Sequence, residues 1–342
     1  MSTMKEIAHL AGVSRGTVDR VFNNRGLVKP DTEKKIREIA KSLNYSPNIA
    51  GKNLAVRKKK LKFGYVLFGD SDINSFFAEV IRGIKDRASE LSDFGVTVEI
   101  RISPPDEPEW QLKCIDELMQ LGISGLAITP ITTAVIADKL KKLTKTGFPV
   151  VTANIDIADC GRLAYVGSNY IKSGEIAAGL MHLITKGEVN IGIISGSPEI
   201  RCHYERVAGF TEYSKKHYRN FSIIHESKNN DSYDRSYSAT LEILKSFPQI
   251  NALYITGAGS SGVCDAVLEY IPDRKIPIIC YDATPLTCRL LKDGVISATI
   301  TQEPVKQGAM PLDILLDYLN LGAVPKTELN YTDIEIMIKE SL

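Results

Sequence analysis

The first side chains that could do chemistry lie between residues 14 and 20. Ser14 has the type of a helix N-cap residue. The outer face of the helix that follows would carry Arg15, Gly16, Thr17 and Arg20. Guanidinium groups donate to base edges and phosphate oxygens, and small or hydroxylated residues allow a close approach to a groove. This pattern is typical of a helix that reads the major groove of DNA.

A second group of polar side chains follows predicted strands in the rest of the chain. Asp156, Asp282 and Gln302 come after the segments 150–154, 277–281 and 297–300. Carboxylates and amides bridge adjacent sugar hydroxyls, and aromatic rings cover apolar sugar faces. Further polar and aromatic candidates of this kind are Asn74, Phe76, Phe77 and Arg206. Structural roles remain open, with the phenylalanines in a core and the aspartates as helix caps.

Two short helices joined by a tight turn would position the first group. Thr3 and Glu6 have the spacing of a capping box, and Gly12 allows the left-handed turn before Ser14. The predicted apolar stripe of the first helix consists of Ile7, Ala8 and Leu10. The segment is therefore predicted to be a helix-turn-helix.

The distribution of charge supports a polyanion as the partner of this segment. Residues 1–60 contain 14 Lys and Arg against 5 Asp and Glu, and the remaining residues contain 28 against 36. A nearly neutral chain has therefore placed its positive charge at one end.

Alternating strands and helices would position the second group. The predicted strands are 96–102, 125–129, 149–154, 189–194, 222–226, 251–256 and 277–281. The helical patterns between them include 77–91, 111–121, 172–184 and 237–247. This order predicts α/β architecture with two doubly wound parallel-sheet lobes, whose ligands bind beyond the carboxyl ends of the strands.

One motif favours a rival function. Gly257, Gly259 and Gly262 form a G-x-G-x-x-G pattern after a predicted strand, and Asp282 ends the next strand. This arrangement is the fingerprint of an NAD-dependent oxidoreductase. The fingerprint normally opens the first βα unit, whereas here several units precede it and about 80 residues follow. An enzyme and a bound cofactor are therefore not expected.

The cysteines and histidines predict no metal site. The six cysteines contain no C-x-x-C, and the five histidines are scattered. The pair Cys202-His203 is typical of a nucleophile beside a base, but the sequence shows no third partner to orient it.

The hydropathy pattern argues against membrane insertion and export. No apolar run approaches the ~20 residues that span a bilayer, and the N-terminus lacks a continuous apolar segment. We expect a cytoplasmic protein, which disfavours a transport-linked binding protein as a third possibility.

The helix-turn-helix resembles the lactose-repressor (LacI/GalR) family of bacterial transcription regulators. The shared residues are Ile7, Ala8, Ala11, Gly12, Val13, Ser14, Thr17, Val18, Arg20, Val21, Asn23, Ala40, Leu43, Asn44, Tyr45, Pro47, Asn48 and Leu54. The rest of the chain is similar to a type 1 periplasmic sugar-binding protein. The resemblance implies a helix-turn-helix domain at 1–46, a hinge helix and linker at 47–61, and a two-lobed effector-binding and dimerisation domain at 62–342.

This resemblance also implies how the chain would work. A homodimer would bind a near-palindromic operator, most simply as a repressor, and its affinity would be controlled by a monosaccharide, sugar acid or sugar phosphate between the lobes. The implied DNA contacts are Thr3, Ser14, Arg15, Gly16, Thr17, Arg20, Asn23, Asn48 and Leu54, with the leucine inserted into the minor groove. No leucine heptad follows the strand near 333–338, so a tetramer is not expected.

The effector contacts implied by the resemblance match the second group of residues. They are Asn74, Phe76, Phe77, Asp156, Arg206, Asp282 and Gln302, to which Arg201 and Gly257 are added as local candidates. The first lobe would span about 62–165 with a return near 297–328, and the second about 166–295 plus the last strand. Three positions depart from the family pattern, namely Asp19, Lys29 and Gly51.

Overall fold

The computed structural model describes residues 3–22, 28–43, 59–68, 75–104, 107–197, 200–273 and 275–342. Several predicted functional positions lie outside the described residues, namely Asn23, Asn48, Gly51, Leu54 and Asn74. The DNA contacts and effector contacts proposed for them stay predictions.

Three helices form the N-terminal part, namely α1 (Met4–Ala11), α2 (Arg15–Phe22) and α3 (Pro30–Ser42). The Thr3 hydroxyl caps α1 by accepting from the Glu6 N–H at 3.3 Å, and Ser14 caps α2 by accepting from the Thr17 N–H at 3.1 Å. Gly12 closes α1 with a φ of +70°, in the left-handed region that glycine tolerates. These local signals confirm the predicted helix-turn-helix.

A small apolar core holds the three helices together. Ile7, Val18 and Ile36 are fully buried at its centre. The prediction that Leu10 belongs to the stripe was wrong, since it is 51% exposed and Ala11 is buried in its place. At 100° per residue, Ala11 lies beside Ile7 on the helix, whereas Leu10 is turned away from the centre of the buried face.

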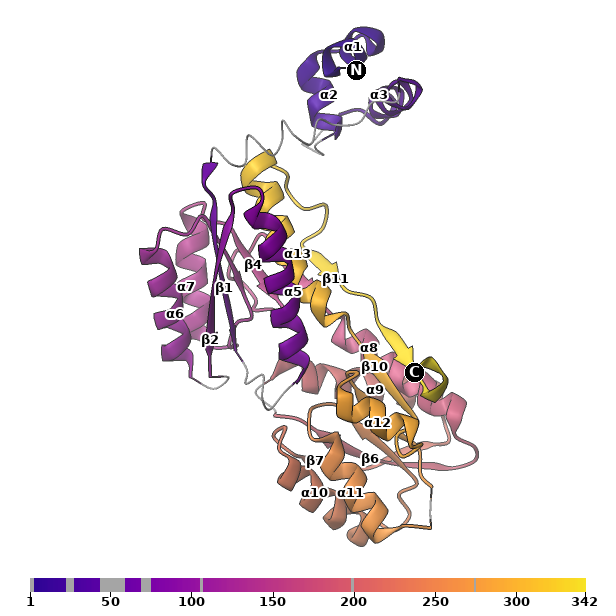
Figure 1. Cartoon of the computed structure of the whole chain (residues 1–342). Coiled ribbons are helices and arrows are strands. Elements are labelled where there is room, and N and C mark those ends of the chain that lie inside the picture. Colours follow the sequence, from indigo (N-terminus) through magenta and orange to yellow (C-terminus); the bar gives the residue numbers. More distant parts are fainter. Residues whose placement is uncertain are drawn as a thin grey trace. The chain divides into compact units, whose positions relative to one another are not determined.

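Contacts divide the chain into two compact units. Unit 1 comprises Met1–Phe68, Ile81–Val166 and Gly308–Asn330, and unit 2 comprises Gly69–Val80, Gly167–Gln307 and Tyr331–Leu342. Each unit contains one six-stranded sheet (Figure 1). The chain therefore passes between the units more than once, as the family resemblance implied.

The sheet of unit 1 has the strand order β11-β5-β4-β3-β1-β2. Its strands are β1 (Lys62–Phe68), β2 (Thr97–Ser103), β3 (Gly125–Ile128), β4 (Val150–Ala153), β5 (Ala164–Gly167) and β11 (Leu329–Tyr331). The helices α5 (Ser75–Ser92), α6 (Pro108–Gln120), α7 (Ala134–Lys145) and α13 (Pro304–Leu321) connect or follow them. Strands β1 to β5 pair in parallel, and β3 to β5 are buried along their length, as helix-covered parallel strands are.

The sheet of unit 2 has the order β12-β10-β9-β8-β6-β7. Its strands are β6 (Val189–Ser195), β7 (Phe221–Lys228), β8 (Ala252–Ile255), β9 (Ile278–Tyr281), β10 (Ala298–Thr301) and β12 (Glu335–Met337). Its helices are α8 (Tyr170–Ile184), α9 (Arg201–His217), α10 (Tyr233–Ser246), α11 (Ser260–Tyr270) and α12 (Pro285–Lys292), and a short 3₁₀ turn covers Lys339–Ser341.

The predicted return to the first lobe near residue 297 was wrong. Strand β10 pairs in parallel with β9 and antiparallel with β12, so it belongs to unit 2. The return begins at Gly308 within α13. Sequence periodicity does not reveal which of two sheets a short buried strand joins, because both offer the same apolar environment.

Side chains that alternate along the strands form two separate cores, one on each face of the sheet of unit 2. Leu253 and Ile255 face the core that contains residues of α10, α11 and α12. Tyr254 and Tyr281 face the core that contains residues of α8 and α9. Because successive side chains of a strand point to opposite faces, both tyrosines lie on the face of the sheet that α9 covers. The polar residues of unit 2 gather near this face.

Candidate functional site

The outer face of α2 presents the residues expected to read DNA. Arg15, Gly16 and Arg20 are exposed, while Thr17 is half-buried and its hydroxyl lies 3.0 Å from the Ser14 hydroxyl. Asp19, the departure noted in the sequence, is also half-buried. The two arginines therefore remain available for phosphate or base contacts, whereas Thr17 shares its hydroxyl with the helix cap.

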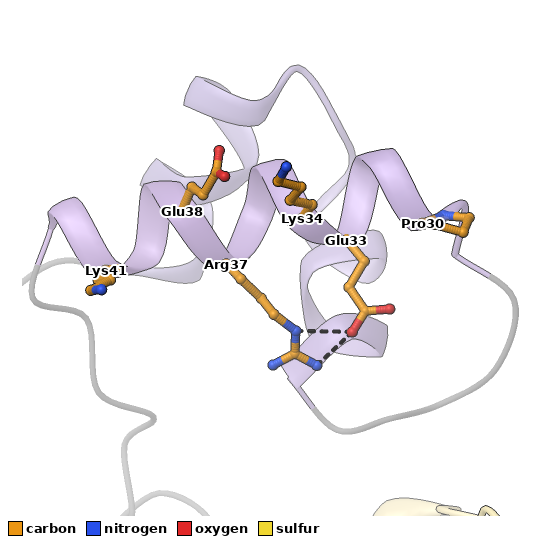
Figure 2. Close-up of a pocket in the computed structure, with 6 residues that line it drawn as sticks. All are labelled: Pro30, Glu33, Lys34, Arg37, Glu38 and Lys41. Carbon is orange, nitrogen blue, oxygen red and sulfur yellow. Dashed lines mark hydrogen bonds and ion pairs between the residues drawn. The ribbon is translucent and has the colours of Figure 1, made fainter.

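Helix α3 contributes Arg37, which the sequence analysis did not single out. A shallow hollow lies on the outer face of α3, lined by Pro30, Glu33, Lys34, Arg37, Glu38 and Lys41 (Figure 2). Arg37 pairs with Glu33 through Nε and Nη2 at 2.9 and 2.7 Å, and Nη2 also donates to the Val21 carbonyl at 3.3 Å. The i, i+4 spacing of the ion pair was visible in the sequence, but the bond to the end of α2 was not.

The start of α3 confirms one departure from the family pattern. Lys29 occupies the N-cap position and makes no side-chain capping bond, and Pro30 begins the helix. Proline at the first turn needs no N–H partner, so it offsets part of the missing cap.

Arg206 is the most deeply placed charged candidate of unit 2. It is 3% exposed, and its Nη1 donates to the Thr256 carbonyl at 2.7 Å. Its Cζ lies 3.7 Å from the ring centroid of Tyr281 and 5.2 Å from that of Tyr170. Among the described residues, its Nε has no hydrogen-bond partner. A buried guanidinium with one unpaired donor is suited to bind an incoming oxygen atom.

Helices α8 and α9 pack against each other (Figure 1). Two glycines allow them to come close enough to hold Arg206 in its place. A Cβ at Gly174 would collide with the Arg206 carbonyl oxygen, and a Cβ at Gly209 would collide with the Ile171 carbonyl oxygen. The two helices therefore meet backbone to backbone, which fixes the height of Arg206 above Tyr281.

Asp282 and Gln302 form a second polar element at the same sheet edge. Gln302 Nε2 donates to Asp282 Oδ1 at 2.9 Å, and the Gln302 carbonyl accepts from Gln307 Nε2 at 2.7 Å. Burial raises the pKa of Asp282, and the nearby Arg206 charge and the Gln302 bond oppose that shift. The alternative role of Asp282 as a helix cap was wrong, because Thr284 caps α12.

The structure adds a histidine and an aspartate that the sequence did not single out as effector contacts. His203 Nε2 lies 3.3 Å from Asp231 Oδ2, and the Oδ1 atom of the same carboxylate accepts from the Ala258 N–H at 2.7 Å. Burial lowers the pKa of His203, but Cys202 and Asp231 outweigh it and raise the pKa to about 10. Burial would raise the pKa of Asp231, yet its bonds to His203 and to backbone N–H groups leave it lowered. The position of Asp231 just after β7 was the available signal.

Gly257 makes room for this pair. A Cβ at Gly257 would collide with the Asp231 carboxylate, and a Cβ at Gly196 would collide with the His203 ring. The other glycines of the G-x-G-x-x-G pattern also have structural reasons. Gly259 has a φ of +86°, and a Cβ at Gly262 would meet the Tyr233 carbonyl of α10. The pattern is therefore explained by packing, without a nucleotide.

The remaining candidates have their own partners within each unit. Asp156 lies in unit 1, where it accepts from Arg162 at 2.6 and 2.7 Å and from the Thr152 hydroxyl at 2.8 Å. Arg201 pairs with Glu205 at 2.6 Å.

Phe76 and Phe77 lie in the first turn of α5 and are 5% and 8% exposed. Their rings meet edge to face at 5.3 Å between centroids. Roles of these residues in effector binding stay predictions.

The described residues contain neither a candidate metal site nor a candidate membrane-spanning helix. Where the structure describes the chain, no three His, Cys, Asp or Glu side chains are placed to hold a metal ion. No helix in the described ranges is long and apolar enough to cross a membrane.

Comparisons with known proteins agree with this arrangement. Residues 3–48 match the family described as bacterial regulatory proteins, lacI family, and residues 64–323 match the periplasmic binding protein domain. The HTH-type transcriptional regulator MalR of Streptococcus pneumoniae is 27% identical over 326 residues, 93% of each chain. Catabolite control protein A of Staphylococcus epidermidis is 26% identical over 93% of this chain and 92% of its own.

A solved structure extends the comparison to the effector domain. GanP, a glucose-galactose binding protein from Geobacillus stearothermophilus, is 25% identical and superposes with a TM-score of 0.73. The match covers 82% of this chain and 99% of GanP. The chain belongs to the lacI family of bacterial regulatory proteins and carries a periplasmic binding protein domain behind its DNA-binding helices.

Proposed function

We propose that the protein is a homodimeric, sugar-responsive repressor that acts on operator DNA in the cytoplasm. Two copies of α2 would enter successive major grooves of a near-palindromic site, with Arg15 and Arg20 against phosphates or base edges. The observation that carries the effector half of the proposal is Arg206, buried to 3% exposure with an unpaired Nε beside the hydrogen-bonded pair Asp282 and Gln302.

The donors and acceptors of this cluster fit a polyhydroxylated ligand. Arg206 offers donors, Asp282 and Asp231 offer acceptors, and the rings of Tyr281 and Tyr170 flank the guanidinium. Adjacent hydroxyls of a sugar present donors and acceptors in the same close spacing. The cluster therefore supports a monosaccharide as the effector class.

The charge balance favours a neutral sugar over a sugar acid or phosphate. The cations Arg206 and His203 are matched by the carboxylates of Asp231 and Asp282. Arg201, the cation that would have favoured an anionic sugar, is paired with Glu205. A sugar acid or sugar phosphate would therefore bring a negative charge into a cluster whose cations are already paired with carboxylates.

Control of DNA binding requires only a modest energy. A coupling of about 1–3 kcal/mol between effector and operator changes affinity about 5- to 150-fold. The hinge helix proposed for residues 47–61 would transmit this coupling, with Leu54 as the minor-groove wedge.

A thermal-shift screen tests the effector half. Neutral monosaccharides, uronates and sugar phosphates are compared, because a ligand at 100 times its Kd adds about 2.7 kcal/mol of stability. We expect stabilisation by a neutral sugar, loss of that shift in Asp282→Asn, and retention in the exposed control Asp293→Asn. Stabilisation by anionic sugars alone would refute the neutral class.

Fluorescence anisotropy with DNA selected from a random pool tests the regulatory half. We expect the stabilising sugar to change affinity for the selected site and Arg20→Ala to weaken binding. Stabilisation by NAD with no DNA selected would contradict the proposed function and support the oxidoreductase alternative.

A further inference from the structure

Lys59 contacts the carboxyl end of α13 from the segment 47–61, which is proposed as hinge and linker. Its Nζ donates to the Leu319 carbonyl at 2.7 Å and to the Asn320 carbonyl at 3.1 Å. The lysine and these acceptors are 260 and 261 residues apart in the chain. The contact therefore joins the end of the linker segment to a helix from the far end of the sequence.

The last carbonyl groups of α13 show why a cation is held there. Gly322, at a φ of +65°, and the residue after it donate their N–H groups to the two carbonyls that precede that of Leu319. The Leu319 and Asn320 carbonyls come next, and Lys59 supplies their donor. The last turn of α13 contains no basic residue of its own, so Lys59 also supplies the positive charge that the helix dipole favours at this end.

The opposite end of α13 is hydrogen-bonded to the candidate effector site. Gln307, the fourth residue of the helix, is fully buried, and its Nε2 donates to the Gln302 carbonyl at 2.7 Å. Gln302 in turn donates from its own Nε2 to Asp282 at 2.9 Å. The helix begins in unit 2 and continues without a break to Leu321 in unit 1. One helix therefore has its start at the effector cluster and its end at Lys59.

We propose that Lys59 is a positioning residue through which α13 controls the linker to the DNA-binding helices. A sugar that binds Asp282 and Gln302 changes the hydrogen bonds at the start of α13. A helix is a rigid element, so a displacement of its start reaches the carbonyl groups that hold Lys59. The inference rests on the proposed function and names the contact through which the effector acts on DNA affinity.

Lys62 makes a matched contact that the proposal does not use. Its Nζ donates to the Leu121 carbonyl at the end of α6, at 3.1 Å. All of α6 lies in unit 1, and none of its residues belongs to the candidate effector site. Replacement of Lys62 therefore removes the same kind of bond and one positive charge, but it leaves the connection from Gln302 to Lys59 intact.

Hydrogen exchange of the full-length protein tests the contact without DNA or sugar. Lys59→Ala should speed exchange of the amides in a peptide that covers residues 317–324 about two- to fivefold, because the cation no longer caps the last turn. Lys62→Ala should leave exchange in this peptide unchanged. Equal exchange in the wild type and Lys59→Ala would overturn the proposal at its first step.

Anisotropy titrations with DNA selected from a random pool test the coupling. The effector probe is an equimolar mixture of D-ribose, D-xylose, D-glucose, D-galactose and D-mannose. We expect the mixture to change the DNA affinity of the wild type and of Lys62→Ala by the same factor, and that of Lys59→Ala by a factor at least about threefold smaller. Lys59→Arg, which keeps the charge and the donors, should restore the response. An equal factor in Lys59→Ala would refute the role of Lys59, whereas no response in the wild type would contradict the proposed effector class.

The salt dependence of DNA binding distinguishes a positioning role from a direct phosphate contact. Each phosphate contact contributes about 0.9 to the slope of log affinity against log salt concentration. Because α13 already holds the Lys59 ammonium group, Lys59→Ala should keep the slope of the wild type. A slope reduced by about 0.9 would place Lys59 on the DNA backbone and contradict the proposal.

Discussion

The guanidinium of Arg206 lies over the ring of Tyr281, with 3.7 Å between Cζ and the ring centroid. The Tyr281 hydroxyl in turn lies 2.8 Å from the Tyr254 hydroxyl and donates to the Ser173 hydroxyl at 3.3 Å. A buried cation is therefore supported by an aromatic face whose polar edge is itself satisfied. This stack links the core of unit 2 to its candidate effector site.

Two replacements of Tyr281 should distinguish the contribution of its ring to stability from the contribution of its hydroxyl. Tyr281→Leu removes the cation–π contact and part of the core, so we expect a loss of at least about 2 kcal/mol in the free energy of unfolding. Tyr281→Phe keeps the ring and should lose about 1 kcal/mol for its hydrogen bonds. Urea denaturation measures both, and a larger loss in the phenylalanine variant would show that the stack contributes little.

The contact between α8 and α9 should be sensitive to one methyl group. Gly174→Ala places a Cβ against the Arg206 carbonyl oxygen, and overpacking of this kind costs about 1–3 kcal/mol. Gly179→Ala in the same helix is the matched control, because its Cβ would meet only the Tyr218 hydroxyl at 3.7 Å. Alanine favours a helix, so the control should be neutral or up to about 1 kcal/mol more stable. Equal destabilisation of both variants in urea would argue against the close approach.

The raised pKa of His203, which Cys202 and then Asp231 cause against the effect of burial, should make stability depend on pH above neutrality. The folded-state pKa of His203 is raised from 6.5 to about 10, so its stabilisation is present in full below pH 6.5 and is lost as pH rises towards 10. The difference in melting temperature between the wild type and His203→Gln should therefore shrink between pH 6.5 and 10. A constant difference over that range would mean that the histidine is neutral in the folded protein.

Arg37 should affect DNA binding through its hydrogen bond to Val21 near the end of α2, the helix proposed to enter the major groove. Arg37→Ala removes the partly buried hydrogen bond to the Val21 carbonyl, and a bond of this kind is worth about 0.5–1 kcal/mol. We expect about a two- to fivefold loss of operator affinity beyond the loss in Lys41→Ala, which removes one positive charge from the same helix. Anisotropy titrations measure both variants, and equal losses would leave Arg37 with only a charge effect.

The features that the sequence by itself determined depend on interactions between residues close together in the chain. Capping at Thr3 and Ser14, the left-handed Gly12 and the exposed arginines of α2 depend on neighbours a few residues away, so spacing was sufficient to predict them. Apolar periodicity likewise predicted most strands and helices of both units, because each element buries a face wherever it packs.

Tertiary structure alone decided which polar groups meet. Asp231, Asp282 and Gln302 follow three different strands of unit 2, and Arg206 lies in α9. The parallel strand order brings the carboxyl ends of these strands and the start of α9 to one edge of the sheet. Asp156 also follows a strand of a parallel sheet, that of unit 1, where the fold brings it against Arg162. The sequence determines which side chains can bind a polar ligand, whereas strand order and helix packing determine which of them share a site, since those contacts join residues far apart in the chain.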